Sequence, residues 1–170
     1  MPQRRPQPDL DRVREALRAR DQAPGPEPGS DGLHEGVSVT ALDLDGDERF
    51  QPLRRELGAS AFGLNLIRLR PGQRGRIHRH EHQEEVYVVL EGTLTLEVER
   101  EPHELPRGCA IRVAPNLRRR LANAGGEPLA VLAIGGATPH QGRDGVAFAE
   151  WEDETGASPQ DIPLPEDLEL

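Results

Sequence analysis

Hydrophobic and polar residues alternate with a period of two over several short stretches of this chain, which is the pattern of half-buried β-strands. Turn-forming glycine, proline or asparagine separates most of these stretches, as at Pro71-Gly72 and Glu91-Gly92. Short strands at this spacing are typical of an antiparallel sandwich or barrel rather than of alternating strands and helices. The predicted fold class is therefore all-β, with strands at 37–41, 61–70, 85–90, 93–99, 111–114, 117–123 and 129–134.

The two ends of the chain differ from this pattern. Residues 1–32 are rich in proline, and the only periodic stretch there predicts either a short helix beginning at Asp9 or a disordered segment. Residues 152–170 carry seven acidic groups and no basic one. We expect this second segment to be a solvated acidic tail; the alternative is that it docks through Ile162, Leu164 and Leu168. The chain thus divides into an N-terminal tail at 1–32, a β-barrel domain at 33–151 and an acidic C-terminal tail at 152–170.

Charge and composition narrow the classes of partner. The chain has 170 residues, which favours one domain, and its net charge of −9 argues against nucleic acid and anionic membrane surfaces. No apolar run approaches the roughly 18 residues of a membrane-spanning helix. A single cysteine, Cys109, cannot form an internal disulfide, and the proline- and arginine-rich N-terminal stretch, without an apolar run, does not have the pattern expected of a secretory signal. These observations favour a cytoplasmic protein.

Chemistry is concentrated in one short stretch. His78 and His80 are two positions apart in an extended segment, so their imidazoles lie on one face about 6.6 Å apart. Glu85 begins the next strand, which returns after a short turn and can face the same point. Two neutral imidazoles and a carboxylate, with positions left open, are the ligands of a catalytic-type metal site. We therefore predict one divalent transition metal, compatible with Fe, Mn, Ni, Co or Zn, held by His78, His80 and Glu85.

The same stretch resembles the first sequence motif of the cupin superfamily. Five residues stand at the separations of that motif, and every anchor is present: Gly72, His78, His80, Glu85 and Gly92. The resemblance implies a small double-stranded β-helix, or jelly-roll barrel, with short flanking tails and with the metal in its mouth. It also implies a homodimer, for which an exposed edge strand at 37–42 would provide a physical route.

The stretch from Pro106 through Pro115 to Asn123 resembles the second cupin motif, with one informative departure. In metal-binding members this motif supplies a fourth ligand, a histidine four residues before the asparagine. Arg119 occupies that position here. An arginine stays protonated and has no acceptor atom, so it cannot ligate a metal.

Three arrangements of Arg119 are open at this point. The metal can be held by three ligands alone, with Arg119 binding a substrate carboxylate through both ends of its guanidinium. Arg119 can instead pair with Glu85 and abolish metal binding. In the third arrangement Arg119 turns outward and another histidine completes the shell, for which the candidates are His82, His103 and His140.

The resemblance covers enzymes and non-enzymes, so it leaves the reaction open. We expect a metal-dependent enzyme, of dioxygenase or isomerase type, acting on a small carboxylate-bearing or oxygen-rich molecule. Arg119, Tyr87 and Asn65 are the predicted substrate-binding residues, and no catalytic residue is assigned. The alternative is a non-catalytic cupin that binds or senses a small ligand, with an Arg119–Glu85 pair in place of the metal.

Overall fold

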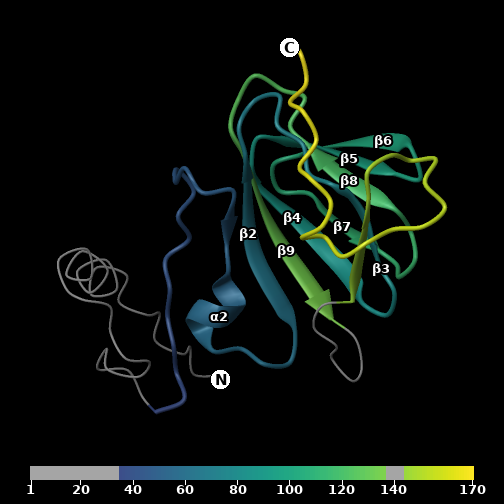
Figure 1. The fold of residues 1–170 in the computed structure, drawn as a ribbon. Helices are drawn as coiled ribbons and strands as arrows, with labels where there is room; N and C mark the ends of the chain where they lie inside the picture. Colours follow the sequence, from purple (N-terminus) through teal and green to yellow (C-terminus); the bar gives the residue numbers. More distant parts are fainter. Residues whose placement is uncertain (1–34, 137–143) are drawn as a thin grey trace, which may run out of the picture.

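Two antiparallel five-stranded sheets face each other in the computed structural model, which describes residues 35–136 and 144–170 (Figure 1). One sheet has the strand order β1-β2-β9-β4-β7 and the other β10-β3-β8-β5-β6. The strands of the first sheet are β1 (Phe50–Gln51), β2 (Gly63–Leu69), β4 (Glu84–Glu91), β7 (Ala110–Val113) and β9 (Leu129–Gly136). Those of the second are β3 (Ile77–His80), β5 (Thr93–Val98), β6 (Glu101–Pro106), β8 (Arg119–Ala122) and β10 (Gly145–Phe148). The predicted all-β jelly-roll barrel is confirmed.

The core lies between the two sheets and follows the period-two pattern of the sequence. Tyr87 and Val89 of β4 are buried, and so are Leu94 and Leu96 of β5 on the facing sheet. Their neighbours along each strand point away from the core and are only partly buried. This alternation fixes which face of β4 is internal, and it gives Glu85 the same inward parity as Tyr87.

Three strands were not predicted from the pattern: the two-residue β1, β6 and β10. β6 has the sequence EPHELP and is almost wholly exposed, because it is an edge strand that pairs only with β5. Prolines are tolerated at such an edge, where the missing N–H group costs no ladder bond. β10 is only four residues long, and it pairs with β3 through residues that include Gly145 opposite His80. Strand β10 matters for the candidate site, because its pairing with β3 places a downstream segment beside the histidines.

The predicted strand at 37–41 is wrong, since these residues form no strand in the structure. Side chains hold the segment instead: the hydroxyl of Ser38 donates to the carbonyl of Leu57, and that of Thr40 donates to the carboxylate of Glu56. Both partners belong to the short helix α2 (Leu53–Leu57). The segment therefore offers no edge for pairing between two copies, and the expected homodimer stays a prediction without this route.

The acidic C-terminal segment, residues 152–170, lies against the barrel and is not the solvated tail that its charge favours, but it is held through its backbone, and Leu164, one of the three apolar residues of the alternative, is 44% exposed. Its backbone pairs with β10 at Ala147 and Ala157, and the N–H of Leu168 donates to the carbonyl of Gly72 at 2.7 Å. Gly72 has a φ of +81°, and a Cβ there would lie 2.9 Å from the carbonyl oxygen of Leu168. Glycine therefore permits both the turn and the close approach of this segment.

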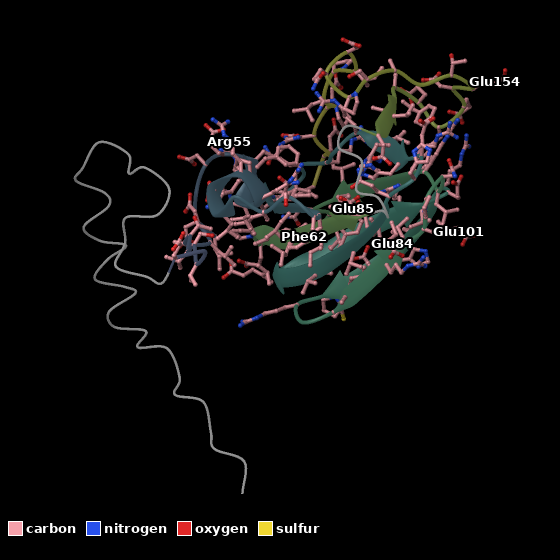
Figure 2. All side chains as sticks on the ribbon, turned by 90° about the horizontal axis from the view of Figure 1, so that it is seen from below. Arg55, Phe62, Glu84, Glu85, Glu101 and Glu154 are labelled. Carbon is pink, nitrogen blue, oxygen red and sulfur yellow. The ribbon has the colours of Figure 1, made fainter. Side chains whose placement is uncertain are left out.

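The C-terminal segment lies near α2 at one end and far from it at the other, since Asp167 forms an ion pair at 3.9 Å with Arg49, just before β1. In Figure 2, Arg55 of α2 and Glu154 of the C-terminal segment lie far apart, with Glu85 between them. Among the described residues, no helix has the length and apolarity that crossing a membrane requires. The predicted helix at Asp9 and the candidate ligand His140 lie outside the described residues.

Candidate metal centre

Three predicted ligands converge between the two sheets. His78 and His80 project from β3 and Glu85 from β4, and one ligand atom from each lies within 4.8 Å of the others. The two imidazole rings are nearly perpendicular, with their centroids 5.6 Å apart. Their Nε2 atoms lie 3.8 Å (His78) and 3.3 Å (His80) from Oε2 of Glu85. The sequence thus predicted both the members of this group and their meeting point.

Each histidine is held through its other ring nitrogen. Nδ1 of His80 lies 2.8 Å from Oδ1 of Asp144, and Nδ1 of His78 lies 3.1 Å from the carbonyl oxygen of Arg76. Both partners are acceptors, so Nδ1 donates in each case and the lone pair of a neutral ring is on Nε2. Such outer contacts orient metal-binding imidazoles and raise their basicity. Both lone pairs are therefore directed toward Glu85.

Asp144 is a residue of the candidate site that the sequence did not reveal. It is buried beside β10, and besides His80 it accepts the backbone N–H groups of His82 and Gln83 and the Gln83 side-chain amide. Burial raises the pKa of Asp144, but these hydrogen bonds outweigh it, so that the pKa falls below 3.8. Asp144 is therefore an anchored anion, and it lies 64 residues from His80 in the sequence.

Arg119 points inward and is fully buried, with no exposed surface. Its Nη2 donates to Oε2 of Glu85 at 2.9 Å, and its Nη1 donates to the carbonyl of Leu117 at 3.1 Å. The hydroxyl of Tyr87 also donates to Oε2 of Glu85 at 2.5 Å. The Arg119–Glu85 pair of the second arrangement is thus formed, but the histidine cluster remains intact beside it.

The third arrangement finds no support among the described histidines. His82 is exposed and its ring lies 3.9 Å from Asp144, outside the cluster. His103 lies on the exposed edge strand β6. Neither reaches the cluster to complete a fourth position.

The contacts of Glu85 keep it ionised. Burial alone would raise the pKa of this carboxyl, but the close contacts with the rings of His78 and His80 and the charge of Arg119 hold it well below 4.5. The pKa of Tyr87 moves the other way: burial and the neighbouring Glu85 charge raise it well above 10. At neutral pH the site therefore contains a carboxylate and a neutral phenol.

This donor set fits a divalent transition metal. Arg119 and Tyr87 both bond to Oε2 of Glu85, and among the described residues no hydrogen bond is made to its other oxygen, Oε1. Two oriented imidazoles and an ionised carboxylate are the ligand types that such metals take. The group of His78, His80 and Glu85 could hold a metal ion.

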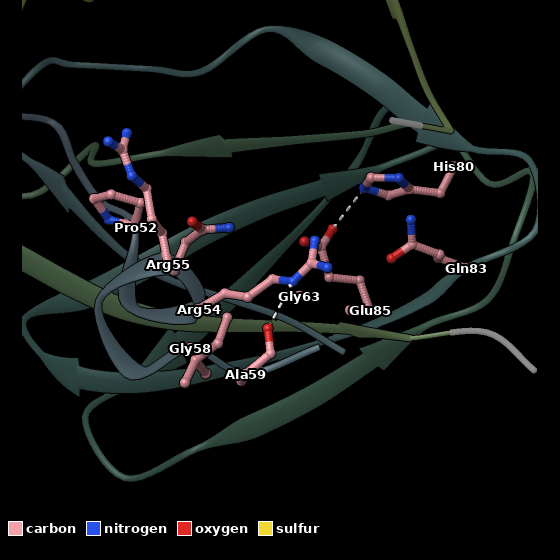
Figure 3. A pocket seen from close by; sticks show the side chains of 12 residues that line it. Pro52, Arg54, Arg55, Gly58, Ala59, Gly63, His80, Gln83 and Glu85 are labelled. Atoms are coloured by element: carbon pink, nitrogen blue, oxygen red, sulfur yellow. Dashed lines mark hydrogen bonds and ion pairs between the residues drawn. The ribbon is translucent and has the colours of Figure 1, made fainter. Parts of the chain in front are cut away.

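Two pockets meet at this group. The larger, of about 520 Å³, is bounded on one side by α2 and the loop after it, and on the other by His80, Gln83 and Glu85 (Figure 3). The smaller, of about 360 Å³, is mainly apolar and includes Tyr87 together with Pro159 and Leu164 of the C-terminal segment. Of the predicted substrate-binding residues, Asn65 lines both pockets, Tyr87 lines the smaller, and Arg119 lines neither.

Residues 65–135 match the family model described as a cupin domain. These residues form a cupin domain. Solved cupins have the same fold: one from Bacteroides fragilis is 21% identical with a TM-score of 0.54, covering 61% of this chain and 86% of that one. A second, from Salinispora arenicola, is 20% identical with a TM-score of 0.50, covering 59% of this cupin and 88% of the other.

Two further relatives differ in what is known of them. A structure described as a sugar phosphate isomerase from a cupin superfamily, from Silicibacter pomeroyi, is 26% identical with a TM-score of 0.51, covering 68% of this cupin and 79% of that chain. An uncharacterized protein of Methanocaldococcus jannaschii is 31% identical over 61 residues, which are 36% of this cupin. The match spans 49% of the length of that archaeal protein.

Proposed function

We propose that this cupin binds one divalent transition metal through His78, His80 and Glu85 and is a metal-dependent enzyme of isomerase type. The observation that carries the proposal is the pair of Nδ1 contacts, from His78 to a backbone carbonyl and from His80 to Asp144. A histidine that merely packs in a strand does not require its outer nitrogen to be fixed. Here both rings are fixed with Nε2 toward an ionised carboxylate, at the junction of two pockets.

The surrounding residues prepare this site for an oxygen-rich ligand. When bound, the metal would supply a Lewis acid that polarises a ligand oxygen. Arg119 and Tyr87 hold Glu85 in one position and keep it ionised, which is the state that ligation needs. Asn65 offers an amide to a ligand in either pocket. The apolar walls of the smaller pocket restrict water on the other side of the group.

The likeness to the Silicibacter pomeroyi protein supports the isomerase type and a small, oxygen-rich, anionic substrate. The same three ligands also occur in Fe(II) oxygenases. The identity of the bound metal therefore bears on the reaction: dependence of turnover on dioxygen would favour the oxygenase type instead. Turnover of phosphorylated sugars without dioxygen consumption is the result that we expect.

A second candidate function follows from the Arg119–Glu85 pair. A carboxylate already paired with a buried cation is a weaker metal ligand, so a cupin of this kind could bind a small molecule without a metal. In that case the histidines would offer hydrogen bonds to the ligand. The pair is formed in the structure, and this observation supports the non-catalytic function as the second candidate.

Metal content separates the two functions. We would purify the protein without chelator and measure transition metals by elemental analysis, beside His78→Ala and the control His103→Ala, which removes an exposed histidine of β6. We expect close to one equivalent in the wild type and in the control, and strong loss in His78→Ala. Less than about 0.1 equivalent in the wild type, or equal content in all three proteins, would overturn the enzyme proposal.

A further inference from the structure

Arg54 of α2 lies on the wall of the larger pocket, across from His80 and Glu85. Its guanidinium extends from the helix toward these two residues in Figure 3, while that of Arg55 extends away from them. Nε of Arg54 donates to the carbonyl of Ala59 at 3.1 Å, which fixes the direction of the side chain. Arg54 is thus a half-buried, oriented cation in the same pocket as the candidate metal ligands.

Few other groups in this pocket carry charge. Glu85 is the one acidic residue among its described lining residues, and its charge is balanced by Arg119 below it. Arg54 forms no ion pair with a carboxylate among the described residues, although the chain as a whole carries a net charge of −9. A basic pocket wall on an acidic protein attracts anions locally.

Arg119, which the sequence favoured as the cation for a substrate, is poorly placed for that role. It lines neither pocket, and its three donor positions contact Glu85, Leu117 and Tyr87. Arg54 has its Nε on Ala59 and a long 3.5 Å contact from Nη2 to Ser60, which leaves Nη1 for another acceptor. The two N–H groups of this nitrogen are suited to phosphate or carboxylate oxygens.

We infer that Arg54 binds a terminal oxyanion of the ligand, a phosphate or a carboxylate, while the rest of the ligand reaches His80 and Glu85. The inference rests on the proposed function and names the chemistry of its substrate. A pocket of about 520 Å³ holds a single small molecule that spans this distance. Arg55 adds positive charge at the rim without pointing into the site.

Binding of the anion alone tests this. We would titrate inorganic phosphate, and separately acetate, into chelator-treated protein by calorimetry, so that no metal contributes to anion binding. Arg54→Gln should weaken binding of the preferred anion about tenfold, the loss expected for a charge-assisted hydrogen bond. Arg107→Gln, the same charge change in an exposed turn outside both pockets, should leave it within twofold. Whichever anion shows this difference identifies the group.

A second variant distinguishes loss of the Arg54 charge from damage to the loop that Arg54 contacts. Ala59→Asp keeps the backbone carbonyl that Arg54 contacts and introduces a negative charge on the same wall. It should weaken anion binding at least as much as Arg54→Gln does. The inference is overturned if neither anion binds the wild type at millimolar concentration, if both pocket variants bind as the wild type does, or if Arg107→Gln loses as much.

The same proteins distinguish failure of this inference from failure of the proposed function. Metal affinity, measured by competition with a chromogenic chelator, should be unchanged in Arg54→Gln, because Arg54 is not among the ligands. Intact metal binding without anion binding would refute the role of Arg54 alone. Absence of metal binding in the wild type would refute the proposed enzyme.

Discussion

Asp144 and His80 are joined by a 2.8 Å contact between Oδ1 and Nδ1, across the pairing of β10 with β3. The carboxylate also accepts two backbone N–H groups, from His82 and Gln83, at the turn that follows β3. One buried anion therefore fixes both the ring of a candidate metal ligand and the turn that leads to Glu85. The geometry of the candidate site depends on Asp144, although Asp144 is not a member of the His78, His80 and Glu85 group.

Asp144→Asn should weaken metal binding about 10- to 100-fold, the loss typical of an outer partner of a metal-binding histidine. The amide cannot accept all the hydrogen bonds that the carboxylate accepts, so the His80 ring loses its fixed orientation. Affinity for Zn²⁺ or Mn²⁺ measured by chelator competition checks this. Asp153→Asn is a matched control, since Asp153 also accepts two backbone N–H groups but lies away from the site. Equal effects of the two variants would contradict the role of Asp144.

Metal affinity should decrease as the pH is lowered, and the decrease should begin at a higher pH than for an ordinary histidine. Burial lowers the pKa of His80, but its hydrogen bond to Glu85 and the charge of Glu85 outweigh this and raise the pKa above 6.5. A proton on Nε2 competes with the metal, so affinity should decline at least about tenfold per pH unit below that raised pKa. Glu85 does not add to the decline in this range, because its pKa lies well below 4.5. Constant affinity from pH 8 to pH 6 would refute this expectation.

The metal-free protein should show the opposite trend over the same range. A pKa raised in the folded state means that the contribution of His80 to stability is fully present below pH 6.5 and is lost as the pH rises through the raised value. Denaturation midpoints of chelator-treated protein at pH 6 and pH 8 measure this difference.

Arg119→Met should reduce the free energy of unfolding by about 3–5 kcal/mol, because the buried carboxylate of Glu85 loses its charged partner. The double variant Arg119→Met with Glu85→Gln should lose less than the single variant, since it removes both charges. Urea denaturation of the metal-free proteins gives these values as a double-mutant cycle. Simple additivity of the two single changes would show that the pair is not coupled.

Removal of residues 152–170 should lower stability by about 2–4 kcal/mol, from the loss of several hydrogen bonds worth about 1 kcal/mol each. These include the two between Ala147 and Ala157 and those from Arg74 and Arg76 to carbonyls of the segment. The variant Arg74→Ala with Arg76→Ala keeps the segment and should show a smaller loss. An unchanged urea midpoint in the truncated protein would mean that the segment does not dock in solution.

The convergence of the three candidate ligands could be predicted because their geometry is local. His78, His80 and Glu85 fall within eight positions: strand periodicity directs the two histidines to one side, and the short turn after them returns Glu85 to the same point. Asp144 and Arg54 carry no such signal, since each reaches the site from a distant part of the chain. Only the pairing of β10 with β3 and the packing of α2 beside β2 bring them there, and neither follows from local pattern.

The two errors have distinct physical causes. At 37–41 the alternation of Val37, Ser38, Val39 and Thr40 was read as a strand, but an alternating segment forms a strand only where a partner edge is free. At 152–170 the acidic side chains hid the contacts, because the docking uses backbone carbonyls such as those of Ile162 and Glu166. Arginine side chains reach these carbonyls. Every amino acid has a backbone carbonyl, so the residue types at those positions do not indicate the contact.

Pro159 and Leu164 line the apolar pocket beside the histidines, yet they come from the C-terminal segment and not from the barrel. The candidate metal ligands and this part of the pocket wall are therefore encoded some eighty residues apart, in stretches that share no strand. Substitutions in the segment can reshape the cavity while the ligands and the core stay unchanged. Such an arrangement lets selection alter which molecules are accepted without putting the chemistry of the centre at risk.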